Sequence, residues 1–110
     1  MQSISIYLSD NSDLAEYEAI NKGYRVDVFV KVGNGFFNLR IYTLTRLQQD
    51  FETEFEADGF YSVEPNLVLV NDTNRTEIIN TINQLQKQKY FEHIKESIDS
   101  IDISKLAKIQ

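Results

Sequence analysis

Residues 24–58 read YRVDVFVKVGNGFFNLRIYTLTRLQQDFETEFEAD, and this stretch decides the fold. In its first nine residues a tyrosine and four valines occupy every second position, a period of two that predicts a strand with one buried face. Gly33-Asn34-Gly35 follows, and glycine and asparagine tolerate the positive φ angles of a short hairpin turn. The alternation resumes at Phe36, so the sequence predicts a β-hairpin.

The period changes after Tyr42. Apolar residues then recur at intervals of three, four and four positions, which places them along one side of a helix. Thr43 or Thr45 can cap the start of this helix, and Gly59 can end it in a left-handed conformation. We expect the helix to cover the hairpin, so that both bury their apolar faces. The apolar positions of the helix are Leu44, Leu47, Phe51 and Phe55.

The remaining elements are predicted from shorter patterns on either side. Alternation in residues 4–8 predicts a short strand, and residues 14–21 can form one or two helical turns. Residues 67–70 are continuously apolar, which favours a central strand covered on both faces. Asn74 and Glu77 have the spacing of a capping box and so predict the start of a helix. Two apolar stripes predict two C-terminal helices, one with Ile78, Ile79, Ile82 and Leu85 and one with Phe91, Ile94, Ile98 and Ile101.

Together these elements predict an α+β fold. We expect a mostly antiparallel sheet of about four strands with a central β-hairpin, and helices packed on the sheet. The chain has 110 residues, of which 42% are hydrophobic, and this size and composition are typical of a single domain spanning residues 1–110. Residues 102–110 lose a consistent apolar phase, so we expect a frayed C-terminal tail there.

The composition excludes several kinds of site and partner. The chain has no cysteine, so it cannot form a disulfide, a thiolate zinc site or a cysteine nucleophile. It shows no basic N-terminal region followed by a long apolar run and no apolar stretch of membrane-spanning length, so we expect a cytoplasmic protein. Seventeen acidic and eleven basic residues give a formal net charge of −6, which argues against nucleic acid and anionic membranes as partners. The charge suits a basic protein partner, and it also serves solubility alone.

No residue pattern in the chain is that of a catalytic, cofactor or metal site. His93 is the only histidine, and one histidine cannot assemble the usual histidine-rich metal site. On a helix whose apolar stripe contains Phe91 and Ile94, His93 is expected to face solvent. Gly33-Asn34-Gly35 lacks the lysine and the strand-to-helix setting of a phosphate loop. We therefore expect a protein that is not an enzyme and that binds no cofactor or metal.

The helix predicted after Tyr42 carries a series of acidic residues with no intervening base. At about 100° per residue, these acids lie on both flanks of the apolar stripe. Like charges four positions apart destabilise a helix by a few tenths of a kcal/mol per pair. Either packing within the fold or a basic partner can offset this repulsion. The acidic residues are Asp50, Glu52, Glu54, Glu56 and Asp58.

The outer face of the predicted hairpin is a second candidate for partner binding. It combines aromatic residues with arginine, a mixture that is enriched at protein interfaces. Either this face is exposed and available to a partner, or the C-terminal helices cover it and make Phe29 and Phe36 part of the core. The residues of this face are Arg25, Phe29, Lys31, Phe36, Asn38, Arg40 and Tyr42.

A recognisable layout extends from residue 24 to residue 91. The strand pair is followed by TLTRLQQDF at residues 43–51, then by EPNLVLV at residues 64–70, a predicted helix and Tyr90-Phe91. This layout resembles small acidic immunity proteins of bacterial polymorphic-toxin systems, and the resemblance implies tight, stoichiometric binding to a cognate toxin.

The leading hypothesis is therefore a non-enzymatic immunity protein that neutralises a toxin through its acidic surface, for which a basic toxin domain is a suitable partner. The alternative is a structural or regulatory α+β domain that self-associates, as a homo-oligomer, through the outer hairpin face. An enzyme is the third hypothesis, and it would need a pocket gathering polar residues that are distant in sequence. The candidate partner-binding residues are Asp50, Glu52, Glu54, Glu56, Phe29, Phe36, Arg40 and Tyr42.

Overall fold

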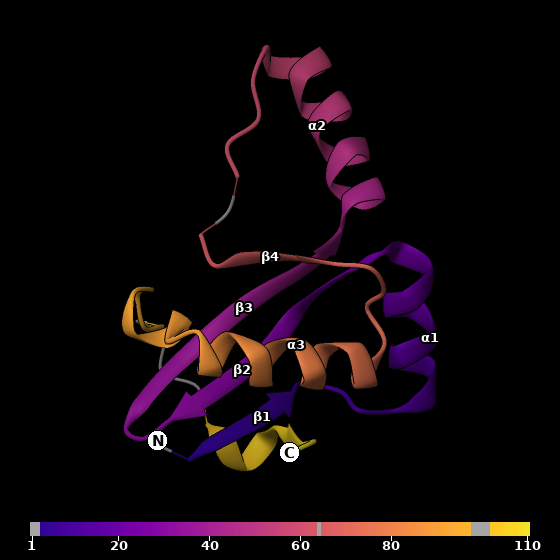
Figure 1. Ribbon diagram of the computed structural model, residues 1–110. Helices are drawn as coiled ribbons and strands as arrows, with labels where there is room; N and C mark the ends of the chain where they lie inside the picture. The colour runs from indigo at the N-terminus through magenta and orange to yellow at the C-terminus, as the bar shows by residue number, and fades with distance from the viewer. Residues whose placement is uncertain (1–2, 64, 98–101) are drawn as a thin grey trace.

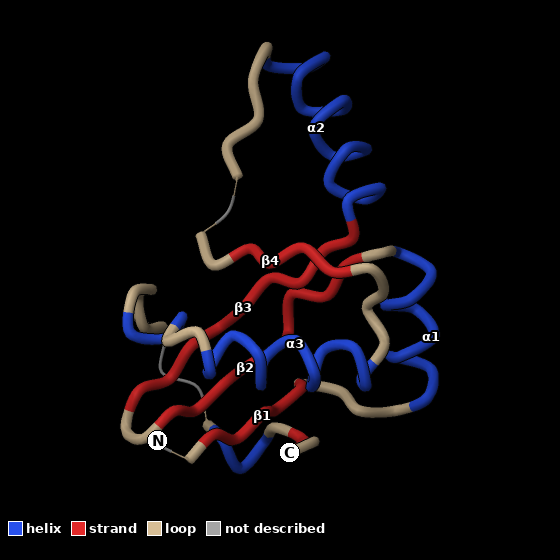
Figure 2. The backbone as a smooth tube through the Cα atoms, viewed as in Figure 1, coloured by secondary structure: helices blue, strands red, loops and turns tan. Residues whose placement is uncertain are grey.

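The computed structural model describes residues 3–63, 65–97 and 102–110 (Figures 1 and 2). It contains three α-helices, two short 3-10 helices (η1 and η2) and five strands in the described residues. Their order along the chain is β1 (Ile4–Leu8), α1 (Asp13–Lys22), β2 (Tyr24–Val32), β3 (Gly35–Thr43), α2 (Leu44–Asp58), β4 (Leu67–Val70), α3 (Arg75–Lys87), η1 (Tyr90–Glu92), η2 (Ile103–Lys105) and β5 (Ala107–Lys108).

The described strands form one sheet in the order β4-β3-β2-β1-β5. β3 and β4 run parallel, and the other neighbouring strands run antiparallel. Val32 pairs with Gly35 across the hairpin, and Gly33 adopts a φ of 57°, which glycine reaches without a Cβ clash. The predicted α+β class, with its mostly antiparallel sheet and central hairpin, is confirmed, and the sheet has five strands where about four were expected.

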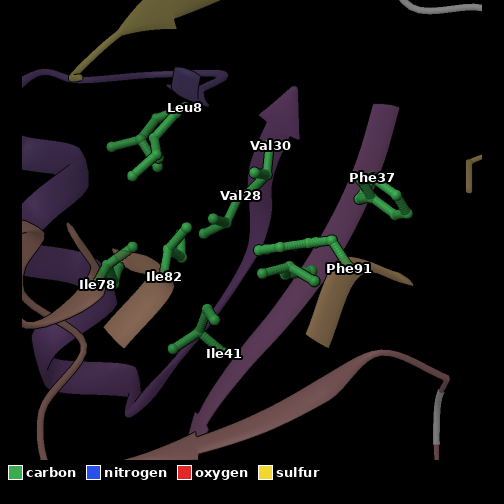
Figure 3. Packing of buried hydrophobic residues seen from close by; sticks show 10 residues of the cluster. Leu8, Val28, Val30, Phe37, Ile41, Ile78, Ile82 and Phe91 are labelled. Atoms are coloured by element: carbon green, nitrogen blue, oxygen red, sulfur yellow. The ribbon is translucent and has the colours of Figure 1, made fainter. Parts of the chain in front are cut away.

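α3 covers one face of the sheet and forms the core with it (Figures 1 and 3). The helix begins as its sequence predicts, because Asn74 Oδ1 accepts the backbone amide of Glu77 at 2.8 Å. Ile78 and Ile82 then point into the sheet and are fully buried. The buried cluster consists of Ile6, Leu8, Val28, Val30, Phe37, Leu39, Ile41, Ile78, Ile82 and Phe91.

α2 does not cover the hairpin, so that expectation is wrong. The helix runs away from the sheet (Figures 1 and 2), and none of its residues is buried. The connection explains the difference, because Leu44 directly follows Thr43, the last residue of β3, with no linker between strand and helix. α3, in contrast, is joined to β4 by residues 71–74, which turn the chain back over the sheet.

β4 lies at an edge of the sheet, whereas its apolar sequence predicted a central strand covered on both faces. Val68 and Val70 pack against the core. Leu69 points to the opposite face and is 48% exposed. One long edge of β4 has no neighbouring strand in the described part of the chain. The continuous apolar run was therefore misread as two-sided burial.

An irregular register between Arg25 and Val28 reverses the expected alternation at the start of β2. An extra residue in a strand shifts the side chains that follow it to the opposite face, and so Val26 is exposed although Val28 is in the core. Arg25 pairs with Ile41, a core residue, and is only 5% exposed. The prediction that Arg25 lies on the outer hairpin face is therefore wrong.

The predicted second C-terminal helix is not formed in the described residues. A single 3-10 turn, η1, carries Phe91 into the core, and Ile94 packs against the same cluster. Ile98 and Ile101 of the predicted stripe lie outside the described residues. In residues 102–110, where we expected fraying, η2 precedes β5, and β5 pairs with β1.

Candidate protein-binding site

The main projection of the molecule consists of α2 and residues 59–63, which together we call the arm. The arm extends past β4 and away from the rest of the fold (Figure 1). Thr43 fixes its start, because Thr43 Oγ1 accepts the amide of Arg46 at 3.3 Å and the Thr43 amide donates to the Gly23 carbonyl oxygen at 2.8 Å. Gly59 ends the helix with a φ of 80°, so both predicted helix ends are confirmed.

Stacked aromatic rings and an ion pair hold the base of the arm. The rings of Tyr24 and Tyr42 stack with centroids 5.3 Å apart, and the Arg46 guanidinium lies 4.5 Å from the centre of the Tyr24 ring. Arg46 Nε also donates to Asp50 Oδ1 at 3.0 Å. Burial raises the pKa of Tyr42, and the negative charge of Asp50 raises it further. Tyr42 is only 8% exposed, so it supports the arm and offers little contact surface.

The outer half of the arm presents its apolar stripe to solvent. Phe51 and Phe55 stack with ring centroids 5.6 Å apart, yet they are 48% and 54% exposed. Phe60 and Val63 continue the apolar surface beyond the end of α2. Among the described residues, five of the ten exposed large hydrophobic side chains belong to residues 44–63. Such a concentration on one projection is typical of an interaction surface.

Acidic side chains flank this exposed stripe, as the helical spacing predicted. Glu52, Glu54 and Glu56 are all exposed. Asp50 differs from them, because it is half-buried and paired with Arg46. Arg46 is the last basic residue before the end of α2, so no base within the outer half of the helix neutralises its acids. The outer half of the arm therefore combines apolar surface with negative charge.

The outer hairpin face presents a second, smaller aromatic group. Phe29 and Phe36 stack with ring centroids 5.8 Å apart. Both are half-buried and stand outside the buried cluster, so among the described residues they are neither fully exposed nor part of the core. Asn38 lies beside them in β3, where its side-chain amide donates to the carbonyl oxygens of Val26 and Val28 at 3.0 and 3.1 Å.

The candidate partner-binding residues fall into groups at opposite ends of β3. Phe29 and Phe36 lie near the hairpin turn, while Tyr42 and the acidic residues lie at the arm. Phe36 and Thr43 are seven positions apart, which is about 23 Å along a strand. Arg40 lies between the two groups and pairs with Leu67 of β4. One compact surface does not join all eight residues.

The sequence interpretation missed the exposure of Leu69 and the free edge of β4. β4 lies at the base of the arm (Figure 2). β3 ends at residue 43 and α2 begins at residue 44, and this direct connection was a signal that α2 would leave the sheet. Helix boundaries predicted from sequence are too imprecise to show that two elements are joined directly.

The described residues contain neither a metal-binding cluster nor a membrane-spanning helix. His93 is exposed, and within this part of the chain no cluster of three or more His, Asp or Glu residues has a geometry that could hold a metal ion. None of the described helices has the length and apolar character needed to cross a membrane. Comparisons with protein-family models, curated proteins and solved structures found no match to this chain.

Proposed function

We propose that this protein is a non-enzymatic protein-binding module whose arm binds a basic protein partner. The observation that carries the proposal is the exposure of Phe51 and Phe55 between the acidic flanks of α2. A surface that served solubility alone would not need two stacked phenylalanine rings at its centre.

The acidic and apolar parts of the arm have different roles in this proposal. Glu52, Glu54 and Glu56 attract a basic partner and speed its encounter with the arm, an effect that salt screens. Phe51 and Phe55 then lose their remaining exposed surface in the complex, which contributes about 1 kcal/mol each. Asp50 contributes less to the attraction because Arg46 pairs with it.

The more specific proposal is an immunity protein that acts in the bacterial cytoplasm and neutralises a cognate toxin by stoichiometric binding. The net charge of −6 supports it, since a basic toxin domain is a matching partner. The resemblance of residues 24–91 to small acidic immunity proteins also supports it.

The outer hairpin face supports a second candidate, a self-associating structural or regulatory domain. Stacked and half-buried Phe29 and Phe36 are the observation that favours it. If this face forms the interface, Phe29→Ser should convert an oligomer into a folded monomer. A sedimentation velocity experiment on both proteins measures this difference.

The test of the arm proposal is affinity capture with three versions of the full chain as bait. The first is the natural sequence, and the second carries Glu52→Gln, Glu54→Gln and Glu56→Gln. The third changes the same number of exposed acids away from the arm, at Glu18, Glu92 and Glu96, and controls for total charge. Each bait is incubated with an extract of the cells that naturally produce this protein, first at low and then at physiological salt concentration.

The proposal expects one basic protein to be retained in a one-to-one ratio by the natural sequence and by the control bait. The arm variant should lose that protein at lower salt, and the purified partner should be inhibited in its own activity assay by the natural protein. Equal retention by all three baits would remove the acidic arm from the binding mechanism. If the bait retains only further copies of the same protein, the result favours the self-association candidate.

A further inference from the structure

β4 leaves one edge of the sheet uncovered at the foot of the arm. It is the terminal strand of the sheet order, and all four of its residues, 67–70, are apolar. Sheet edges that are not used for binding are commonly protected by lysine, proline or a bulge within the strand. β4 contains none of these, since Pro65 precedes it and Asn71 follows it.

Backbone polar groups of Leu67 and Leu69 point toward this open edge. The Arg40 amide donates to the Asn66 carbonyl oxygen at 3.1 Å, so the carbonyl group that precedes β4 points toward β3. Successive residues of a strand point these groups to alternate sides, which directs the amides and carbonyls of Leu67 and Leu69 away from β3. Within the part of the chain that the structure describes, no strand pairs with that side. These outward amide and carbonyl groups can form hydrogen bonds with the backbone of another extended segment.

The surroundings of the edge specify which segment would match it. α2 and residues 59–63 extend beyond β4 (Figures 1 and 2), and the exposed Leu69 and Val63 side chains lie on these neighbouring segments. Glu52, Glu54 and Glu56 make the arm negative, so a segment with alternating basic and apolar residues is complementary to it. A second copy of this chain is less suitable, because its own acidic arm would approach the first one.

We propose that the partner adds an extended, basic segment to the free edge of β4 as a sixth strand, with its side chains against the arm. Main-chain hydrogen bonds to Leu67 and Leu69 fix the segment, and its alternate side chains provide selectivity. This inference rests on the proposed function, because it describes how the same partner binds.

The test uses the full chain labelled with ¹⁵N and a synthetic probe, an acetylated octapeptide amide of four Lys-Val repeats. A matched peptide of four Glu-Val repeats tests the charge requirement. A third peptide carries Lys-Val repeats with N-methyl groups on its four central backbone nitrogens, which removes hydrogen-bond donors on both of its edges. Amide chemical shifts report the site that is bound, and their concentration dependence gives the affinity.

Two variants of β4 separate the backbone from the side chain. Leu69→Pro removes the outward amide and costs no bond to β3, and proline is tolerated in edge strands. Leu69→Ala keeps the amide and shortens the side chain. If Leu69→Pro fails to fold, as its amide spectrum will show, the N-methylated peptide provides the same comparison on the natural protein.

The inference expects saturable shifts at residues 67–70 and on α2 with the Lys-Val peptide, and no binding of the N-methylated peptide. Leu69→Pro should weaken binding by at least about tenfold, the equivalent of one hydrogen bond, and Leu69→Ala by no more than about threefold.

The contrary results separate this inference from the proposed function. Shifts confined to α2 and unaffected by Leu69→Pro would overturn strand addition and leave the arm proposal intact. Shifts at β4 that the Glu-Val peptide produces equally would overturn the basic partner and leave the open edge as a site. A dimer of the free protein paired through β4 would overturn the inference, because a second copy would then be the occupant.

Discussion

Glu16 joins α1 to the start of α3 through Arg75. Its Oε1 accepts the Arg75 backbone amide at 2.6 Å, and its Oε2 accepts Arg75 Nε at 2.8 Å. The first of these bonds satisfies an amide at the start of α3 that has no partner within the helix. The hydrogen bonds from Arg75 lower the pKa of Glu16 despite the opposing effect of burial.

Replacement Glu16→Gln should lower the free energy of unfolding at pH 7 by about 1 kcal/mol. Because the pKa is lower in the folded state, the carboxylate stabilises the fold above the unfolded pKa, and this contribution is lost as pH falls through the folded value. Urea denaturation at pH 7 and at pH 3 measures the difference. Glu18→Gln, an exposed neighbour on α1, is the control. If the free energies of unfolding of the natural protein and the Glu16→Gln variant differ as much at pH 3 as at pH 7, the stabilisation does not come from the charge of Glu16.

Arg25 is a buried cation, and Asp27 provides the negative charge that compensates it. Arg25 Nε lies 2.6 Å from Asp27 Oδ1, and its Nη2 also donates to Asp27 and to the Asp10 carbonyl oxygen. Burial acts to raise the pKa of Asp27, but hydrogen bonds from Arg25 and Ser9 outweigh it and lower the pKa. The bulge that placed Arg25 here could not be predicted, because period-two alternation contains no signal for an inserted residue.

Asp27→Asn should destabilise the fold by about 3 kcal/mol, since it leaves a buried guanidinium without its counter-charge. Adding Arg25→Met to this variant should recover most of the loss, because the uncompensated charge is removed. Thermal and chemical denaturation of the two variants and the natural protein measure both steps. A double variant no more stable than Asp27→Asn would show that the loss comes from packing and not from charge.

At the scale of elements, α2 and α3 show what the sequence can and cannot predict. Both were predicted from helical spacing and a capping residue, Thr43 or Asn74, and both form. Their environments differ, since Ile82 is fully buried and Phe55 is exposed. Periodicity and capping are local properties of the chain. Which helix covers a sheet depends on connection lengths and on competition for one face, and neither is encoded in the stripe itself.

The candidate site divides in the same way. The position of Glu52 and Glu56 beside Phe51 and Phe55 followed from helical geometry, which the sequence contains. The exposure of that stripe and the edge position of β4 depend on tertiary arrangement. Leu69 shows the limit, because its apolar neighbours in β4 predicted burial on both faces and only one face is covered.

Alanine substitutions in the two helices should have very different effects on stability. Ile82→Ala should lower the free energy of unfolding by about 3 kcal/mol, through lost burial and a cavity. Phe55→Ala should change it by no more than about 0.5 kcal/mol, because its side chain is largely in solvent already. Guanidinium denaturation of each variant measures both values. A loss from Phe55→Ala as large as that from Ile82→Ala would mean that the arm packs on the sheet in solution.

At the scale of the whole molecule, negative charge and exposed apolar surface oppose each other. The net charge is −6 at pH 7, and the acids of α2 concentrate part of it beside Phe51 and Phe55. Two copies that approach through their arms therefore bring like charges together. This repulsion keeps apart the same apolar stripes that would otherwise associate, and it depends on the ionisation of the carboxylates.

The protein should therefore self-associate through its arms as pH approaches its sequence pI of about 4.7. Near that pH the net charge vanishes and repulsion no longer offsets apolar contact between arms. Static light scattering at pH 7.5 and pH 4.7 should show a monomer and then larger species, and Phe51→Ser with Phe55→Ser should prevent the change. Phe29→Ser is the matched control, because it removes an aromatic ring from the outer hairpin face and leaves the arm intact. The double variant Phe51→Ser, Phe55→Ser is compared directly with Phe29→Ser. If the double variant associates as much as the natural protein and Phe29→Ser does not, the interface lies on the outer hairpin face and the apolar stripe of the arm does not mediate self-association.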